Sequence, residues 1–394
     1  MVKPLKILHI TTSLSKYGGI EETIRILCSR LDKRLFQVGI CSITDSPGEI
    51  LNEFKEMKAE IFCGSKKGRI FDIFTVLWVR KVIKSFQADI VHTHNNKGNF
   101  HGRLGSRFSR GVSIVSTHHD LGDLIFSKTP DMKKRIQGKF NAQSAQYENF
   151  IYSIVYPYLN IRMNQLNSKV ITVSDTVRKI YTSDPDNRLF ETVYAPFDET
   201  VFNNTRKGFK NKKIVLGTVG RLEMQKGHIY LLRAMAELVK VRKDIFLKII
   251  GDGTLKKDIE SFIKKNRLES HVILCGSLPH DARLYEDMDI CIQPSVFEGC
   301  SITILEAMGT GIPVIASNID GPKELIIPGK TGILVPPKHP DALKDVVLDL
   351  IENKEKVLKI GNAGNLRALE KFSSKVFIDK MSQIYQGLAT VKEN

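Results

Sequence analysis

Two glutamates lie on either side of a predicted helix start in the stretch PSVFEGCSITILEAMGTGIPVIAS, residues 294–317. Glu298 precedes a glycine, and Glu306 follows Glu298 by eight residues, at most about 12 Å along a helix axis. The two acids are therefore not a tight acid–base pair, but their carboxylates can accept hydrogen bonds from hydroxyl groups at opposite ends of one extended ligand. A sugar or a ribose is a natural ligand of this kind. The alternative is that Glu298 caps the helix and Glu306 lies on the surface.

The start of the same helix can bind an anion, because the first N–H groups of a helix have no partner within it. These N–H groups belong to Cys300, Ser301 and Ile302. Two cations, Arg221 and Lys226, follow a predicted strand in GTVGRLEMQKGH and precede the next helix. A guanidinium binds phosphate oxygens as a fork and an ammonium adds a point charge, so the two together suit a diphosphate. Both can also be ordinary solvated charges of a loop.

A pair of glycines, Gly18 and Gly19, lies between the end of the first predicted strand and a helix in SKYGGIEETIRIL. Without side chains they let a phosphate or a sugar approach the backbone amides closely, and the helix dipole favours negative charge there. The same pair also serves in an ordinary tight turn. It lacks the G-x-G-x-x-G spacing of dinucleotide-binding enzymes.

The elements that would hold these residues alternate between strands and helices along almost the whole chain. Short runs rich in β-branched residues predict strands at 5–11, 36–42, 59–63, 88–94, 112–117 and 168–174, and again at 213–220, 245–251, 271–276, 289–294, 312–317 and 331–337. Helix-like segments lie between them, for example at 20–31 and 71–86. Such alternation predicts an α/β fold with parallel sheets covered by helices on both faces.

The alternation pauses at the polar, basic segment 202–213, which we interpret as a linker. It separates residues 1–203 from residues 204–372, which we predict to be two Rossmann-like, doubly wound domains facing each other across a cleft. The last helix, at 373–390, can pack back onto the first domain. Residues 121–167 contain no clear strand and many aromatic residues, which predicts either a packed helix pair or a surface for a membrane or a lipid acceptor.

The composition is that of a globular protein with two cores: 394 residues, 42% hydrophobic and 26% charged. The six cysteines are scattered without metal-ligand spacing, so we expect buried thiols in a reducing compartment and no metal site. The N-terminal apolar run is too short for a signal peptide and predicts a first strand instead. No apolar run reaches the roughly 18 residues that a membrane-spanning helix requires.

The net charge of +16 is the unusual property of the composition. Basic residues are dense at 65–69, 79–84 and 131–139, all in the first half of the chain. They indicate solvated helix faces, a surface that binds acidic lipid headgroups, or a nucleic-acid footprint. The basic segments contain no RNA-binding motif, so we expect no nucleic-acid partner.

Taken in order, these motifs resemble those of family four of the glycosyltransferases, the retaining group 1 enzymes of GT-B architecture. The ordered set is GGIE at 18–21, GRL–KG at 220–227, EGCSITILE at 298–306, EAMGTGIPVIAS at 306–317 and TGILVPP at 331–337. The resemblance covers nearly the whole chain. It implies that the first domain binds the acceptor and that the second binds a nucleotide-sugar donor.

The resemblance also implies roles for the donor-binding residues. Arg221 and Lys226 would neutralise the donor diphosphate, which the amides from Cys300 to Ile302, with Ser301 between them, would cradle. Glu298 would contact the transferred sugar, and Glu306 would bind the nucleotide ribose. Gly18 and Gly19 would lie near the donor, and Leu278 would lie near its base.

In this family a histidine at the end of a first-domain strand usually faces the sugar. The stretch STHHD supplies His118 and His119, and the T-x-H spacing of the family favours His119. We expect His92 and His94 in VHTH to be structural residues at a strand end.

The sequence departs from the family pattern twice. The common EGFG is EGCS here, which changes a pocket wall, and the frequent PNGVD is APFDE at 195–199, which leaves the contacts to the acceptor open.

We therefore predict an enzyme that transfers a sugar from a nucleotide-diphosphate sugar, most simply a UDP-sugar, to a hydroxyl acceptor with retention of the anomeric configuration. The catalytic residues would be His119, Arg221, Lys226 and Glu298, which stabilise the departing diphosphate and orient the sugar, with no metal or other cofactor. The acceptor would belong to cell-surface polysaccharide or lipid-linked glycan synthesis, and the enzyme would be cytoplasmic, with acidic acceptors or the inner membrane surface as partners. The alternatives are a nucleotide-sugar epimerase or a phosphorylase of the same architecture, and a basic module that binds membrane or nucleic acid without catalysis.

Overall fold

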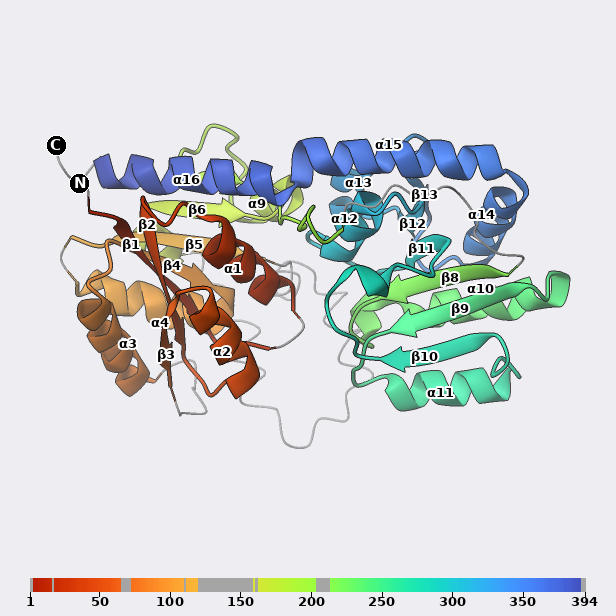
Figure 1. Cartoon of the computed structure of the whole chain (residues 1–394), viewed down its shortest axis with the longest axis horizontal. Helices are drawn as coiled ribbons and strands as arrows, with labels where there is room; N and C mark the ends of the chain where they lie inside the picture. The colour runs from red at the N-terminus through yellow and green to blue at the C-terminus, as the bar shows by residue number, and fades with distance from the viewer. Residues whose placement is uncertain are drawn as a thin grey trace. The chain divides into compact units, whose positions relative to one another are not determined.

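A computed structural model describes residues 3–15, 18–64, 72–109, 111–119, 159, 162–202 and 213–390. The chain divides into two compact units, one formed by Met1–Tyr194 with Ile378–Asn394 and the other by Ala195–Phe377 (Figure 1). Most of the predicted linker at 202–213, most of the segment 121–167 and the basic segments at 65–69 and 131–139 lie outside the described residues.

The division between the units falls before the linker, at 194/195 rather than at 203/204. The reason lies in two aromatic side chains that are buried in the second unit. Phe197 is fully buried and its N–H donates to the carbonyl of Phe372, and the ring of Phe202 lies 5.7 Å from that of Tyr285. The stretch that contains them therefore belongs to the second unit, although its sequence continues from the first.

The first unit is built on a parallel sheet of seven described strands in the order β3-β2-β1-β4-β5-β6-β7. The strands are β1 Leu5–Thr11, β2 Phe36–Ser42, β3 Glu60–Cys63, β4 Ile90–His94, β5 Ser113–His118, β6 Lys169–Thr172 and β7 Phe190–Thr192. The helices described there are α1 Gly19–Arg30, α2 Gly48–Glu56, α3 Ile73–Phe86, α4 Asn95–Arg107, α9 Asp175–Tyr181 and most of α16 Ser374–Thr390, together with the 3-10 turn η2 Asn164–Leu166. The predicted strands 5–11 and 36–42 agree with β1 and β2, whereas the short β7 was not predicted.

The second unit repeats this design with six described parallel strands in the order β10-β9-β8-β11-β12-β13. The strands are β8 Ile214–Val219, β9 Ile245–Ile250, β10 Val272–Gly276, β11 Ile290–Gln293, β12 Val314–Ser317 and β13 Ile333–Val335. The helices are α10 His228–Val241, α11 Lys256–Lys265, α12 Ile302–Gly309, α13 Asp320–Leu325, α14 Pro340–Glu352 and α15 Lys354–Phe372, with 3-10 turns η3 Met224–Lys226 and η4 Ala282–Leu284. The predicted α/β class with two parallel sheets is confirmed.

Each unit has an apolar core between its sheet and the helices that cover it. In the first unit Leu8 and Ile10 of β1 pack with Val79 and Phe86 of α3. In the second unit the strands β8, β9 and β11 share one core with α10 and α14. Burying this apolar surface on both faces of each sheet explains why the strands are continuous β-branched runs rather than alternating ones.

The strand orders fix where ligands can bind. In the first sheet the chain passes from β1 outward to β2 and β3, and then returns to β4 on the other side of β1. In the second sheet β8 and β11 are the corresponding neighbours. The loops that follow these strands separate at the carboxyl edge of the sheet, which is where open α/β sheets bind ligands.

The helix α16 belongs to the first unit from Ile378 onward, although it follows the whole second unit in sequence (Figure 1). Tyr385 on this helix is fully buried, and its ring lies 6.1 Å from that of Phe36 on β2. Lys380 donates a hydrogen bond to the carbonyl of Thr192 at 3.2 Å. The helix is thus part of the covering of the first sheet.

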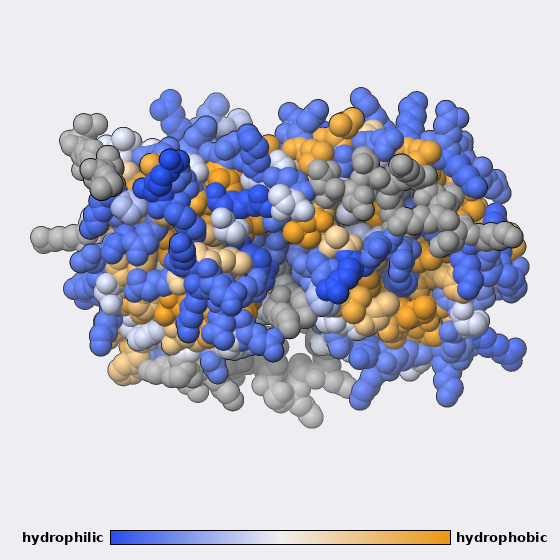
Figure 2. Space-filling model, viewed as in Figure 1, coloured by the Kyte–Doolittle hydropathy of each residue, from blue (hydrophilic) through white to orange (hydrophobic). Residues whose placement is uncertain are grey.

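The surface visible in Figure 2 is largely hydrophilic, with hydrophobic residues in small groups between the polar ones. Within the described ranges, no helix has the length and apolar character to cross a membrane. The cysteines only partly match the expectation of buried thiols: Cys28, Cys41 and Cys291 are buried, but Cys63 is exposed and Cys275 and Cys300 are half-buried.

Candidate functional site

The loops after β8 and β11 are joined by backbone contacts at the carboxyl edge of the second sheet. The N–H of Val296 donates to the carbonyl of Gln225 at 2.7 Å, and the side-chain amide of Gln225 donates to the carbonyl of Phe297 at 3.2 Å. Gly227 has φ +67°, and a Cβ there would lie 2.1 Å from the carbonyl oxygen of Pro294. Only glycine fits this position, so the sequence KG holds the two loops against each other.

This junction brings two of the predicted site residues together. The Lys226 ammonium lies 2.6 Å from Oε2 of Glu298, and the two side chains are 15% and 9% exposed. Ser295 Oγ donates a second hydrogen bond to the same oxygen at 3.2 Å. The alternative that Glu298 caps α12 is wrong, because the N-cap residue is Ser301 and this cap has no side-chain hydrogen bond.

Two polar groups beside this pair are buried without a partner in the described part of the chain. They are Ser301 Oγ at the start of α12 and both ring nitrogens of His228 at the start of α10. Burial, together with the charge of Lys226, lowers the pKa of His228 to about 4, so its ring is neutral at pH 7. Buried polar atoms normally have hydrogen-bond partners, so these groups are available to a ligand at the two helix starts.

The thiol of Cys300 lies next to Ser301. Burial raises its pKa to about 12, so it remains protonated and is not a nucleophile.

Glu306 is buried, with 2% of its surface exposed, so the alternative that it lies on the surface is wrong. Its two carboxylate oxygens have different partners: His280 Nε2 lies 2.6 Å from Oε1, and the Tyr285 hydroxyl donates to Oε2 at 2.6 Å. Burial and the nearby carboxylate raise the pKa of Tyr285 well above its usual value, so the hydroxyl remains a donor. The sequence pattern did not indicate His280 and Tyr285, although both lie in the segment after Leu278.

Arg221 and Leu278 lie on the loops after β8 and β10. The Arg221 side chain is exposed and makes no hydrogen bond or ion pair with other described residues. Leu278 is 37% exposed. The structure therefore puts Arg221 on the same loop as Lys226, and among the described residues no hydrogen bond or ion pair joins its side chain to Glu298.

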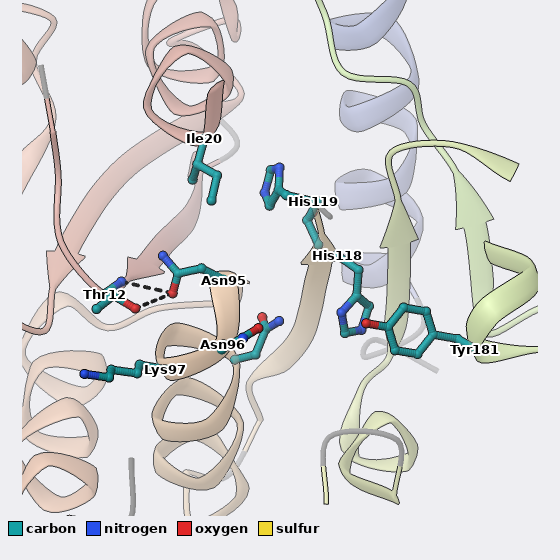
Figure 3. Close-up of a pocket in the computed structure, with 10 residues that line it drawn as sticks. Thr12, Ile20, Asn95, Asn96, Lys97, His118, His119 and Tyr181 are labelled. Atoms are coloured by element: carbon teal, nitrogen blue, oxygen red, sulfur yellow. Dashed lines mark hydrogen bonds between the residues drawn. The ribbon is translucent and has the colours of Figure 1, made fainter. Parts of the chain in front are cut away.

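The first unit has a pocket of about 270 Å³ at the carboxyl edge of its sheet (Figure 3). Thr12 follows β1, Asn95 begins α4 directly after β4, and both line the pocket. Oδ1 of Asn95 accepts hydrogen bonds from the N–H and the hydroxyl of Thr12, so the side chain ties the two loops together (Figure 3). This pocket lies at the switch point between β1 and β4.

His118 and His119 both line this pocket, but their surroundings differ. The ring of His118 stacks on Tyr181 with centroids 4.0 Å apart, and its Nε2 lies 3.2 Å from Asn164 Oδ1. Burial and the charge of Arg103 hold the pKa of His118 well below its usual value. Among the described residues, His119 makes one hydrogen bond, through Nε2, to His94 at 3.0 Å. The other ring nitrogen of His119, Nδ1, is therefore more available to a ligand than the ring of His118.

The glycine loop is fixed by Glu21 of the GGIE motif, a residue for which the sequence predicted no role. Glu21 is buried and accepts hydrogen bonds from the N–H and the hydroxyl of Ser15, both at 2.9 Å. A Cβ on Gly18 would lie 2.1 Å from the Glu21 carboxylate, so a side chain there would displace it. Gly19 begins α1, and residues 16 and 17 lie outside the described part.

His92 and His94 are buried in β4, as expected of structural residues, and His9 of β1 lies beside them. The two nitrogens of His92 face the Tyr385 hydroxyl and the Thr117 hydroxyl, each at 2.6 Å. The spacing of these residues along the chain did not indicate that they meet, because the contact depends on β1 and β4 being neighbours.

Two families match this chain, one for each unit. Residues 202–367 match the family described as Glycosyl transferases group 1, and residues 17–199 match the family described as Glycosyltransferase Family 4.

Curated relatives extend over most of the chain. An uncharacterized glycosyltransferase of Methanocaldococcus jannaschii is 28% identical over 314 residues, which cover 79% of this chain and 78% of that protein. The UDP-Gal:alpha-D-GlcNAc-diphosphoundecaprenol alpha-1,3-galactosyltransferase of Escherichia coli is 24% identical over 337 residues, 82% of this chain and 81% of that protein. Among solved structures, HepE of Anabaena in complex with UDP-glucose superposes with a TM-score of 0.78 at 19% identity, covering 97% of this chain and 100% of that one. This last likeness shows a shared fold.

Proposed function

Since this chain belongs to the glycosyltransferases of group 1 and family four, we propose that it transfers a sugar from a nucleotide-diphosphate sugar to a hydroxyl acceptor. The observation that carries the proposal is the pair of Lys226 and Glu298, 2.6 Å apart at the switch point of the second sheet. An ammonium for a diphosphate and a carboxylate for a sugar hydroxyl lie side by side there, next to the start of α12. The family assignment favours this enzyme over the epimerase, the phosphorylase and the non-catalytic basic module.

The proposed mechanism is stabilisation of the leaving group. As the glycosidic bond breaks, negative charge grows on the diphosphate while the sugar becomes positive. Lys226, the N–H groups at the start of α12 and Ser301 Oγ, which has no partner among the described residues, stabilise that negative charge. The exposed Arg221, on the same loop as Lys226, binds the diphosphate as well. On binding of the donor, before the glycosidic bond breaks, Glu298 exchanges its bond to Lys226 for one to a sugar hydroxyl. The acceptor oxygen bonds to the anomeric carbon on the same face that the diphosphate leaves, which gives retention, and the departing phosphate oxygen takes the proton of the acceptor hydroxyl.

Glu306 is the proposed ribose ligand. One of its oxygens is bonded to the buried hydroxyl of Tyr285 and the other to His280, which is on a loop. A ribose hydroxyl can replace His280 at its oxygen while Tyr285 keeps the carboxylate oriented. The nucleotide base would then lie on the side of Leu278.

We propose a UDP-sugar as the donor and a lipid-linked or polysaccharide precursor as the acceptor. The support comes from the relatives: the Escherichia coli protein is named for UDP-Gal and a diphosphoundecaprenol acceptor, and the Anabaena structure contains UDP-glucose. In the first unit, the pocket with His119 is the proposed place where the sugar and the acceptor hydroxyl are oriented, with Gly18 and Gly19 on the neighbouring loop.

A membrane-bound acceptor requires the enzyme to work at a membrane surface, and α3 has the residues to bind one. Ile73, Phe74 and Leu77 at its start are 59%, 66% and 51% exposed. Lys81 and Lys84 further along the helix are exposed as well. Exposed apolar side chains with lysines on one helix suit an interface of anionic lipid headgroups. We propose that the protein is peripheral at such a surface.

Binding of UDP to the second unit tests the proposal. Titration calorimetry on the full-length protein should detect binding of UDP. The Lys226→Ala variant should raise the Kd about 10- to 100-fold, the equivalent of the roughly 1.5–3 kcal/mol of a hydrogen bond to a charged group. Lys240→Ala is the matched control, because Lys240 is on the exposed face of α10 and pairs with Glu237. Equal UDP affinity in all three proteins would contradict the proposed donor site.

A further inference from the structure

Three histidines form a chain of hydrogen bonds from the interior of the first unit to its pocket. His9 Nδ1 lies 3.0 Å from His94 Nε2, and His94 Nδ1 lies 3.0 Å from His119 Nε2. His9 and His94 are fully buried, whereas His119 lines the pocket (Figure 3). His9 belongs to β1, His94 ends β4 and His119 directly follows β5, and these three strands are adjacent in the sheet.

All three rings are neutral at pH 7. Burial lowers the pKa of His9 to about 3 and that of His119 to about 4, and it holds the pKa of His94 well below its usual value. A neutral imidazole carries one N–H and one lone pair. Each histidine pair therefore needs one donor and one acceptor, and because His94 is in both pairs, the two bonds must run in the same direction.

The inner end of the chain decides that direction. His9 Nε2 is buried and has no hydrogen-bond partner among the described residues. If the bonds run from the pocket inward, this nitrogen carries a buried N–H without an acceptor. If they run outward, it has only an unused lone pair. Orphaned buried N–H groups are the rarer of the two in proteins, so the outward direction is favoured.

A metal ion is the competing explanation for this cluster. One nitrogen from each of His9, His92 and His94 lies within 4.8 Å of the others. However, both nitrogens of His92 are bonded, to Tyr385 and Thr117, and both nitrogens of His94 are bonded to histidines. A metal would have to break several of these hydrogen bonds, so they favour the chain of histidines.

We propose that His94, with His9 behind it, is a positioning residue that holds His119 in the tautomer with its N–H on Nδ1, so that His119 donates a hydrogen bond to an oxygen of the bound sugar. His94 donates to Nε2 of His119. Nδ1 of His119 makes no hydrogen bond to the described residues, so it can donate to the ligand. The role of the ligand in this inference rests on the proposed function. The tautomer itself does not.

Nuclear magnetic resonance of the full-length protein with 15N-labelled histidine tests the tautomer without a substrate. Long-range 1H–15N correlations distinguish a protonated ring nitrogen from a bare one, and the His119→Gln variant assigns the signals. In the wild type we expect His119 to be protonated on Nδ1 at neutral pH. A wild-type His119 protonated on Nε2 would overturn the proposal.

Three variants separate positioning from folding. His94→Phe keeps a ring but removes both hydrogen bonds, and His119 should then populate the other tautomer. His94→Asn retains an amide that can donate from the place of Nδ1, and it should restore the wild-type pattern. Tyr385→Phe is the control, because it removes a hydrogen bond to His92 in the same cluster and leaves the chain intact. An unchanged His119 tautomer in His94→Phe would overturn the proposal.

Kinetics and a metal titration complete the test. With a UDP-sugar that the wild type uses, His94→Phe should lower kcat about tenfold, the loss of one hydrogen bond, and His94→Asn less, with unchanged UDP affinity in both. Stoichiometric binding of Co²⁺ that is lost in His94→Phe would assign the cluster to a metal and overturn the chain. If no nucleotide sugar is used, the proposed function fails while the spectra still decide the tautomer.

Discussion

At the scale of single residues, Lys226 pairs with Glu298 in the structure and would bind the diphosphate of a donor. It lies 2.6 Å from Glu298 in the structure, and a donor diphosphate would claim the same ammonium. A buried carboxylate that loses its partner must gain another, and in the proposed complex a sugar hydroxyl would be that partner. When the pair separates, the Lys226 ammonium could therefore bind the diphosphate while the Glu298 carboxylate binds the sugar of the same ligand. The roles given to Glu298, Glu306 and Arg221 on the basis of the resemblance remain predictions.

The cationic residues predict that transfer needs no metal ion. In the proposed mechanism, Lys226, Arg221 and the start of α12 would supply the positive charge that a divalent cation would otherwise bring to a diphosphate. We expect transfer from a UDP-sugar to proceed at the same rate in excess EDTA. The measurement is release of UDP with and without the chelator. Loss of activity that Mg²⁺ restores would contradict this prediction.

The pairings between site residues could not be predicted from the sequence. Lys226 and Glu298 were both singled out by their types and their neighbours, but their contact depends on β8 and β11 being adjacent. The chain of His9, His94 and His119 depends on three strands in the same way. His280 and Tyr285 were missed because a histidine and a tyrosine on a loop have no distinctive spacing, and only the burial of Glu306 reveals their role.

At the scale of the elements, the proposed donor site is held by the contact between the loops after β8 and β11. Gly227→Ala should disrupt it for two reasons: φ is +67°, and the added Cβ would lie 2.1 Å from the carbonyl of Pro294. Gly329→Ala is the matched control, with φ +73° and open space around the Cβ. The control should lose about 1–2 kcal/mol of stability, the cost of the left-handed backbone alone. Gly227→Ala should lose more, together with its affinity for UDP.

Urea unfolding and UDP titration of both glycine variants measure this difference. Equal losses of stability with full UDP affinity would mean that the close approach of the two loops has no role in the donor site.

The buried histidines of β1 and β4 predict how stability depends on pH. The pKa of His9 is about 3 in the folded protein, against 6.5 for an ordinary histidine. Between these values the unfolded chain binds a proton that the folded one does not, so stability falls as the pH falls from about 6.5 towards 3. Each such histidine contributes up to about 1.4 kcal/mol per pH unit. His9→Gln should reduce the slope of stability against pH by the contribution of one bound proton.

Urea unfolding of the wild type and of His9→Gln on both sides of the ordinary histidine pKa provides the measurement. Above that pKa the two proteins should have parallel pH profiles. Parallel profiles below it would contradict the prediction.

Most elements could be predicted from the sequence because parallel strands buried on both faces are continuous apolar runs. The strands 5–11 and 36–42 match β1 and β2 at both ends, and the predicted helix 71–86 differs from α3 only at its start. The strand β7, Phe190–Thr192, was missed because it has three residues, of which only the first is apolar. The predicted boundary at 203/204 rests on the polar linker, whereas the division at 194/195 follows from the packing of Phe197 in the second unit, which the sequence pattern does not reveal.

At the scale of the whole molecule, the excess of positive charge, +16, and the apolar start of α3 predict binding to anionic membranes. We expect the protein to sediment with phosphatidylglycerol vesicles at low salt and to be released by high salt, because screening weakens the attraction. Phosphatidylcholine vesicles should not retain it. The measurement is the fraction of protein that pellets with the vesicles.

Variants of α3 identify the surface responsible. Phe74→Ser and Lys81→Glu should each reduce the bound fraction, whereas Lys264→Glu on the exposed face of α11 should not, although it changes the net charge as Lys81→Glu does. Binding that depends equally on Lys81 and Lys264, or on neither, would remove α3 from this role.

The return of α16 to the first unit has a consequence for biosynthesis. Tyr385 fills the first sheet's covering layer and bonds to His92, yet a ribosome translates it only after every residue of the second unit. Domains commonly fold in the order in which they are synthesised, but here the first unit lacks α16 until the second unit has been synthesised. A nascent chain that stalls before α16 is synthesised would thus expose the apolar surface of the first unit that α16 covers.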